Sequence, residues 1–216
     1  MKKRLFVDMD GTLAQFHDVE KTFIEAMWQQ GFYINLKPFE NMVNGLRSFI
    51  KSNPDVEVYV LSAVLDTDPP FVVDEKCAWL DKYLPEIPVE RRIFTRAGTN
   101  KADYIGELGS GDYLIDDYNK NLVEFEQAGA HSIKFRNNVN HQGKGAYGGE
   151  KGPLWSGPLV SYDSSPEDIA KQLGNIVTLK KEKNRYLSEK ISEAKKNITK
   201  HLFKRHPSSE KDVHSL

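Results

Sequence analysis

The chain has 216 residues with a net charge of −1, and 39% of them are hydrophobic and 11% aromatic. This composition supports a buried core and excludes an intrinsically disordered chain. The single cysteine, Cys77, excludes an internal disulfide and a cysteine-based zinc site, so we expect a reduced, cytoplasmic protein. The first apolar run is too short for a signal sequence, and no stretch approaches the roughly 20 apolar residues of a membrane span.

Strands and helices are predicted to alternate along residues 4–136. In chain order, we expect a strand at 4–7, helices within 18–50, a strand at 56–61, a helix at 72–83, a strand at 92–94, a helix at 101–108, a strand at 113–115, a helix at 119–128 and a strand at 131–135. This order is typical of an α/β domain with a mostly parallel sheet flanked by helices. The glycine-rich stretch 137–158 is predicted to be a loop, and it contains no nucleotide-phosphate motif.

Acidic residues follow two of the predicted strands. Asp8 and Asp10 come directly after the first strand, and Asp116 and Asp117 follow the strand that contains YLI. Ligands of open parallel sheets bind beyond the carboxyl ends of the strands, so these carboxylates are expected to meet at one edge of the sheet. Two further polar side chains are expected at the same edge, those of Ser62 and Lys101.

Such a set of residues suits phosphoryl transfer. Asp8 could attack phosphorus and form an aspartyl-phosphate, while Asp10 could protonate the leaving oxygen and then deprotonate water. Mg²⁺ would relieve the repulsion between Asp8 and Asp116, because this ion accepts few carboxylates together with water and a phosphate. Ser62 and Lys101 would hold the phosphoryl oxygens.

Each of the supporting residues also has a plain structural interpretation. Ser62 could cap a strand end, and Lys101 could be an ordinary solvated lysine at the start of a helix. Asp117 could either support the metal or cap the helix that follows it.

Four motifs resemble, in order and kind, those of the haloacid-dehalogenase-like phosphatases. They are DMDGT at 8–12, LSAV at 61–64, Lys101 and LIDD at 114–117. The resemblance implies a Rossmann-like core in which Asp8 is the nucleophile and Asp10 the general acid/base. It also implies that Mg²⁺ is held by Asp8, by the backbone carbonyl of Asp10 and by Asp116, and that Thr12 supports the acid/base turn. The phosphate would be bound by Ser62, Ala63 and Lys101.

Within that superfamily, the chain most resembles the 5′(3′)-deoxyribonucleotidase group, also called 5′-nucleotidase type C. The resemblance rests on DMDGTLAQF, on TRAGTNK at 95–101 and on LIDD. It implies a hydrolase of phosphoric monoesters whose substrates are nucleoside monophosphates. The sequence departs from the group's usual pattern at Thr12, Gln15, 62–64 and Tyr118.

The expected domains are a catalytic core at 1–14 and 46–170, a small helical cap at 15–45 and a basic helical tail at 171–216. The cap is rich in aromatic residues, of which Phe16 and Trp28 are the candidates for contact with a nucleobase. The alternative is that these side chains only fill the core.

The tail carries 12 Lys and Arg residues against 5 Asp and Glu residues. Its apolar residues at 187, 191, 194, 198 and 202 predict an amphipathic helix that ends before Pro207. We expect this helix to pack on its own domain or on a second copy of the chain, which would make a homo-oligomer. Nucleic acid is a less favoured partner, and no membrane partner is expected.

Two alternative functions stay open at this point. One keeps the mechanism and changes the substrate to a sugar phosphate or to the phosphorylated end of a nucleic acid. The other is a non-catalytic binding or assembly module of the same fold that acts through its tail helix. The complete set of chemical residues favours an enzyme over such a module.

Overall fold

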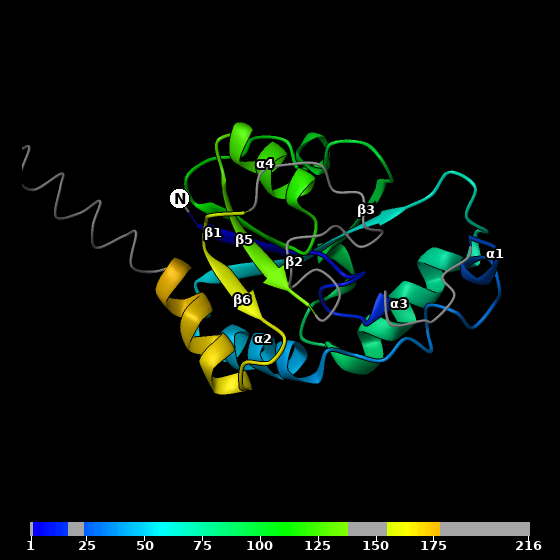
Figure 1. Cartoon of the computed structure of the whole chain (residues 1–216), viewed down its shortest axis with the longest axis horizontal. Coiled ribbons are helices and arrows are strands. Elements are labelled where there is room, and N and C mark those ends of the chain that lie inside the picture. The colour runs from blue at the N-terminus through cyan, green and yellow to red at the C-terminus, as the bar shows by residue number, and fades with distance from the viewer. Residues whose placement is uncertain (1, 17–23, 138–154, 178–216) are drawn as a thin grey trace, which may run out of the picture. The chain divides into compact units, whose positions relative to one another are not determined.

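Six parallel strands form the centre of the molecule. Figure 1 shows the computed structural model, which describes residues 2–16, 24–137 and 155–177. The strands are β1 Lys3–Val7, β2 Val56–Val64, β3 Arg92–Arg96, β4 Asp112–Asp116, β5 His131–Arg136 and β6 Leu159–Ser161. They lie in the order β3-β2-β1-β4-β5-β6, and every neighbouring pair is parallel. The predicted α/β fold with a parallel sheet is therefore confirmed.

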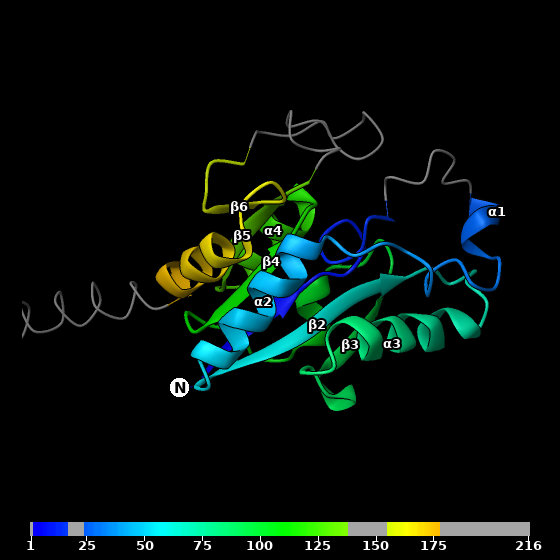
Figure 2. The same ribbon diagram turned by 90° about the horizontal axis from the view of Figure 1, so that it is seen from below.

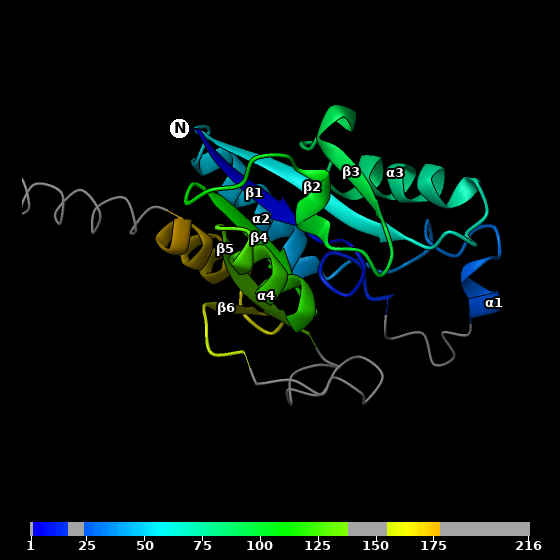
Figure 3. The ribbon, with the colours of Figure 1, turned by 90° about the horizontal axis from the view of Figure 1, so that it is seen from above.

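Helices cover both faces of this sheet. They are α1 Ile24–Met27, α2 Glu40–Ser52, α3 Phe71–Tyr83 and α4 Asn119–Gln127, with short 3-10 helices η2 Val89–Arg91 and η3 Lys101–Tyr104. A further helix begins at residue 166. Figures 2 and 3, seen from opposite sides, show α2 and α3 on one face and α4 on the other. This is the two-sided covering that parallel strands require.

The strand β1 explains why the sheet is buried on both sides. Its residues Leu5, Phe6 and Val7 are all buried, although successive side chains of a strand point to opposite faces. Phe6 packs in a cluster with Leu122 and Phe125 of α4. Leu5 and Val7 therefore face the side that α2 covers, and α2 meets it with a buried stripe at helical spacing, formed by Met42, Val43, Leu46 and Phe49.

The helix that begins at residue 166 approaches α2 closely at Gly45. A Cβ atom at this position would lie 2.7 Å from the side chain of Ile169 and 3.0 Å from the carbonyl oxygen of Pro166. Only glycine leaves room for this approach.

Residue contacts divide the chain into two compact units, Met1–Asn175 and Ile176–Leu216. The candidate site described below lies in the first unit. The predicted amphipathic helix at 187–202 lies outside the described residues. In the part of the chain that the structure describes, no helix has the length and apolar character needed to cross a membrane.

Several elements differ from the sequence-based prediction, among them η2 and the helix that begins at residue 166, neither of which was predicted. The helix expected at 101–108 is only the 3-10 helix η3, and Gly106 follows with φ +73°, a conformation that ends a helical turn. The strand β6 was not predicted, because only three residues pair with β5 and they follow a glycine-rich stretch. The 3-10 helix η3 and the strand β6 are short segments whose structure depends on their neighbours in the fold.

Candidate active site

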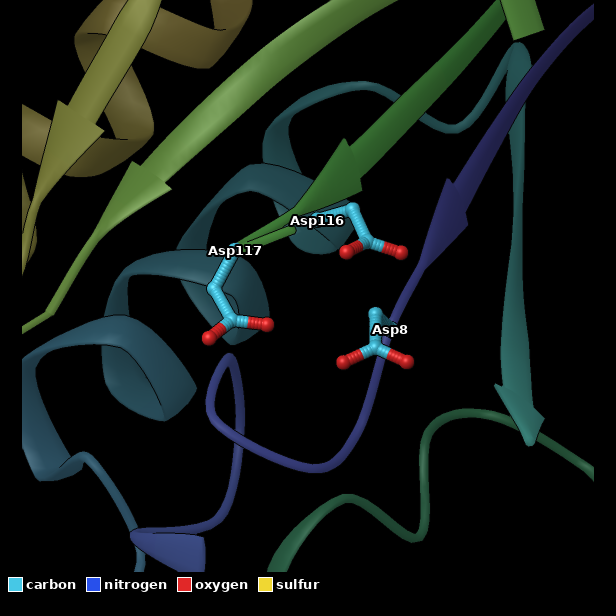
Figure 4. Close-up of side chains that lie close together, drawn as sticks. All are labelled: Asp8, Asp116 and Asp117. Carbon is cyan, nitrogen blue, oxygen red and sulfur yellow. The ribbon is translucent and has the colours of Figure 1, made fainter. Parts of the chain in front are cut away.

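Three buried carboxylates meet where β1 and β4 end. Asp8 follows β1 directly, Asp116 is the last residue of β4, and Asp117 comes next. The two strands are neighbours, with Val7 opposite Ile115, so the chain places Asp8 beside Asp116. Figure 4 shows the three side chains turned toward a common space. Each offers a carboxylate oxygen, and these oxygens all lie within 4.8 Å of one another.

Lys101 neutralises part of this negative charge. Its Nζ donates to Asp8 Oδ1 at 2.5 Å and to Asp116 Oδ2 at 2.8 Å. Burial opposes the charge on Lys101, but the carboxylates of Asp116 and Asp8 outweigh it and hold the lysine pKa above its ordinary value. Burial also raises the pKa of Asp8 well above its usual range; the ammonium group of Lys101 opposes this shift, whereas Asp116 adds to it.

Polar groups of neighbouring elements fix the orientation of Asp116. The backbone N–H of Tyr118 donates to its Oδ1 at 2.8 Å. Asn121 of α4 donates through Nδ2 to its Oδ2 at 2.9 Å. Asp116 is fully buried, so these bonds replace the water that a carboxylate otherwise needs.

Asp117 is held from the next strand. Asn137, directly after β5, donates through Nδ2 to Asp117 Oδ2 at 3.0 Å and to the carbonyl oxygen of Gly11 at 2.9 Å. Gly11 belongs to the tight turn after β1 and has φ +86°, a conformation that favours glycine. Asn137 thus ties the turn that follows Asp8 to the third carboxylate.

A second charged cluster lies at the end of β2. Lys76 of α3 is fully buried, and its Nζ contacts Asp10 Oδ2 at 2.5 Å, Ser62 Oγ at 3.0 Å and the carbonyl oxygen of Ala63 at 2.8 Å. The side chain of Asp10 is therefore paired with a lysine and is not part of the carboxylate group at β1 and β4.

Lys76 was missed in the sequence analysis, although the sequence contains a signal for it. The residues buried on α3 include Val72, Trp79 and Leu80, and position 76 falls on the same helical face. A lysine within an apolar stripe is unusual because lysine is almost never fully buried unless it is paired. That position was the sign of a buried partner.

The structure also describes Thr12 and the two cap candidates, Phe16 and Trp28. The Thr12 side chain is buried, and its hydroxyl has no hydrogen-bond partner among the described residues. Phe16 stacks with Tyr33 at 6.2 Å between ring centroids, and the Tyr33 ring lies 4.8 Å from Lys76 Nζ. Trp28 follows α1, and its indole N–H likewise lacks a hydrogen-bond partner in the described ranges. Tyr33 thus connects Phe16 to the second cluster, formed by Lys76 and its partners and called the lysine cluster below. Among the described residues, no such contact connects Trp28 to it.

A parallel sheet of this order, with buried aspartates at the ends of two central strands, defines the class of protein. The chain is a member of the haloacid-dehalogenase-like superfamily of phosphatases. The sequence profile of the family described as 5′ nucleotidase, deoxy (Pyrimidine), cytosolic type C protein matches residues 17–149. This match covers more than half of the chain, which therefore belongs to that family.

Solved structures show the same fold at low sequence identity. The D,D-heptose 1,7-bisphosphate phosphatase from B. bronchiseptica, crystallised with magnesium and phosphate, is 14% identical with a TM-score of 0.53. The alignment covers 79% of this chain and 97% of that one. The L-2-haloacid dehalogenase PA0810 is 12% identical with a TM-score of 0.50, and 81% of this chain and 99% of that chain are covered. No curated protein sequence matches the chain significantly.

Proposed function

We propose that the protein is a Mg²⁺-dependent phosphomonoester hydrolase whose substrates are nucleoside monophosphates. The observation that carries this proposal is the buried group formed by Asp8, Asp116 and Asp117. Three carboxylates stand against two buried ammonium groups, that of Lys101 and that of Lys134 at the backbone carbonyl of Asp117. This still leaves excess negative charge in a desolvated place, which favours a bound cation. Membership in a 5′-nucleotidase family supports the choice of substrate.

The carboxylate group fits Mg²⁺ by chemistry and by size. This ion prefers oxygen ligands at about 2.0–2.1 Å in an octahedron, which separates ligand atoms by about 3–4 Å. The three carboxylate oxygens, within 4.8 Å of one another, can satisfy that spacing. Asp8 and Asp116 would hold the ion together with the backbone carbonyl of Asp10, and Asp117 is a further candidate ligand. When bound, Mg²⁺ would supply positive charge to the phosphoryl oxygens.

Asp8 is the proposed nucleophile. Its carboxylate oxygen attacks phosphorus while the ester P–O bond breaks, and the electron pair of that bond leaves with the alcohol oxygen. Asp10 gives its proton to that oxygen and later takes a proton from the water that hydrolyses the aspartyl-phosphate. Within the described residues, the buried Oδ1 of Asp10 has no hydrogen-bond partner, whereas its Oδ2 is held by Lys76. One oxygen of Asp10 is thus fixed and the other can carry the proton.

The phosphoryl oxygens would be held between the two clusters. Ser62, Ala63 and Lys101 are the groups proposed from the sequence, and the position of Lys76 beside Ser62 adds a second ammonium group. Positioned cations and hydroxyl groups stabilise the charge that develops on the transferred group. Lys76 would then exchange part of its contact with Asp10 for contact with phosphate.

The nucleoside would contact the cap. Phe16 follows the catalytic turn, and its ring stacks with that of Tyr33 close to Lys76. An aromatic face next to a phosphate site can stack on a nucleobase. Trp28 remains a second candidate from the same cap. Thr12 would support the turn that presents Asp10.

Phosphate release from a panel of substrates tests the proposal. The panel contains nucleoside 5′- and 3′-monophosphates, sugar phosphates and an aryl phosphate, each with Mg²⁺ or with EDTA. We expect nucleotides to give the highest kcat/KM and EDTA to stop the reaction. If nucleotides react no faster than the aryl phosphate, the nucleotidase proposal is wrong. If EDTA has no effect, the metal-dependent mechanism is wrong.

Two further expectations concern the whole chain. A cytoplasmic location agrees with the description of the family as cytosolic. Association of two copies through the tail helix stays a prediction, because residues 178–216 lie outside the described part. The solution mass of the full chain and of a chain truncated after residue 175 would test it.

A further inference from the structure

Glu75 is a buried acidic residue that the mechanism above does not use. It lies on α3 next to Lys76 and is 8% exposed. Its carboxylate oxygens accept hydrogen bonds from the backbone N–H groups of Gly31 at 2.5 Å and of Tyr33 at 3.1 Å. No lysine or arginine forms an ion pair with it among the described residues. A buried carboxylate with such partners is positioned to hold a backbone segment rather than to balance a charge.

The segment held by Glu75 is the part of the cap at 31–36. Gly31 has φ +95°, and its carbonyl oxygen accepts a hydrogen bond from Asn35 Nδ2 at 2.7 Å, so the segment is folded on itself. Trp79 of α3 donates through Nε1 to the carbonyl oxygen of Leu36 at 2.8 Å. Both ends of the segment are therefore attached to α3.

This attachment fixes an aromatic side chain beside the lysine cluster. Tyr33 is the residue whose N–H binds Glu75, and its ring lies 4.8 Å from Lys76 Nζ and stacks on Phe16. Glu75 and Lys76 are consecutive residues of one helix, so they cannot move independently. The helix thus connects the aromatic part of the cap to the proposed phosphate site as one body.

From this arrangement we infer that Glu75 is a positioning residue that sets the specificity for nucleoside leaving groups. By binding the 31–36 segment, it holds the buried ring of Tyr33 in contact with both Lys76 and Phe16, and it thereby keeps the partly exposed ring of Phe16, the candidate for stacking on a base, beside the proposed phosphate site. The inference rests on the proposed function. It adds the residue that makes the cap discriminate between a nucleotide and a phosphate ester without a base.

The test compares Glu75→Ala with Asp74→Ala. Asp74 is the preceding residue of α3, is exposed, and has the same charge, so it is a matched control. For Glu75→Ala, we expect kcat/KM for a nucleoside 5′-monophosphate to fall on the order of 10-fold, mainly through KM, because misplaced binding groups weaken productive binding. For an aryl phosphate, we expect a fall of less than about 3-fold. Asp74→Ala should change neither value.

Amide hydrogen exchange tests the role of Glu75 by a measurement that does not depend on enzyme activity. In Glu75→Ala, the amides of Gly31 and Tyr33 lose their acceptor, so exchange in the 31–36 segment should become faster while exchange in α2 does not change. Glu75→Gln keeps one acceptor oxygen and should give intermediate values in both measurements, and it replaces the alanine variant if that variant does not fold.

Three results would overturn the inference. An equal loss on both substrates would mean that Glu75 supports the fold or the phosphate site in general. Unchanged exchange at 31–36 would mean that Glu75 does not hold the segment. Wild-type protein that hydrolyses the aryl phosphate but no nucleotide would instead refute the proposed function, and this inference with it.

Discussion

The two charged clusters at the carboxyl edge of the sheet have opposite electrostatic character. The carboxylate cluster contains three acidic side chains and one lysine, namely Asp8, Asp116, Asp117 and Lys101. The lysine cluster consists of Lys76 and its three partners, which are the carboxylate of Asp10, the hydroxyl group of Ser62 and the carbonyl oxygen of Ala63. The first has an excess of negative charge, whereas the second is balanced.

This difference would allow one edge of the sheet to bind a cation and an anion together, as the proposed function requires. Buried charges of one sign are costly unless they are compensated, so the carboxylate cluster favours a divalent cation. A buried ammonium group can exchange its carboxylate partner for a phosphoryl oxygen and stay paired, provided that Asp10 then carries the proton assigned to it in the proposed mechanism. The proposed cation site lies at the ends of β1 and β4, and the proposed phosphate site lies at the end of β2 beside the helix α3.

The first prediction removes the proposed nucleophile, Asp8, from the carboxylate cluster. Asn has almost the shape of Asp but cannot attack phosphorus, so Asp8→Asn should lower kcat by about 10⁴-fold or more. Asp55→Asn is the control, since Asp55 is exposed at the opposite end of β2. Steady-state phosphate release measures both. If Asp8→Asn keeps a tenth of the wild-type rate, Asp8 is not the nucleophile.

The second prediction distinguishes the role of Lys76 from the role of Lys101. Lys76→Met should weaken inhibition by inorganic phosphate by about 100-fold, because a buried charge-assisted contact is lost, and it should leave Mg²⁺ affinity within about 3-fold. Lys101→Met should instead tighten Mg²⁺ binding by about 10-fold, because it removes a cation from between the carboxylates that are proposed to bind the metal. Inhibition kinetics and calorimetric Mg²⁺ titration measure the two effects.

The effects of the two lysine variants on phosphate and Mg²⁺ binding decide whether the carboxylate cluster and the lysine cluster act separately. If both variants change phosphate and Mg²⁺ binding to the same degree, the two clusters form one electrostatic unit and their separation is wrong. Met is close to lysine in length and fills the same space, so neither variant should leave a cavity.

The carboxylate cluster could be predicted from the sequence because strand ends determine it. Asp8 and Asp116 each follow a recognisable apolar run, and parallel strands bring their carboxyl ends to one edge. The same argument predicted that Asp10 and Ser62 lie at this edge. The parallel direction of the strands was enough to predict that these residues lie at one edge of the sheet.

The lysine cluster could be predicted only in part because it depends on side-chain direction within a helix. Lys76 and Glu75 are consecutive charged residues in a helix of mixed polarity, and charged helical residues are usually solvated. Their burial depends on where the 31–36 segment lies, and that position results from tertiary contacts. For the same reason η3 was predicted too long, since its end depends on backbone conformation at Gly106.

The third prediction concerns Mg²⁺ and stability. A ligand that binds only the folded protein stabilises it, by about 2.7 kcal/mol at a concentration 100 times its Kd. Urea unfolding with and without Mg²⁺ at equal ionic strength should show this increase. Asp117→Asn should reduce it, because a candidate ligand loses its charge. An equal effect of Mg²⁺ on the wild type and on Asp8→Asn would place the ion elsewhere.

The smallest expected effect tests how the carboxylate cluster is held together. Asn137→Ala removes the hydrogen bonds to Gly11 O and Asp117 Oδ2, so the free energy of unfolding should fall by about 1–2 kcal/mol. Mg²⁺ affinity should fall about 5-fold, because Asp117 loses its fixed orientation.

Asn53→Ala provides the control for this last variant. Asn53 donates through Nδ2 to the carbonyl oxygen of Phe49 at the end of α2, so its loss should lower stability without reaching the carboxylates. Calorimetric Mg²⁺ titration of both variants then separates general loosening from local loss of orientation. If Asn137→Ala loses stability but binds Mg²⁺ as tightly as the wild type, the ends of β1 and β4 alone fix the carboxylate cluster. The bond from β5 would then serve only to hold the turn at Gly11.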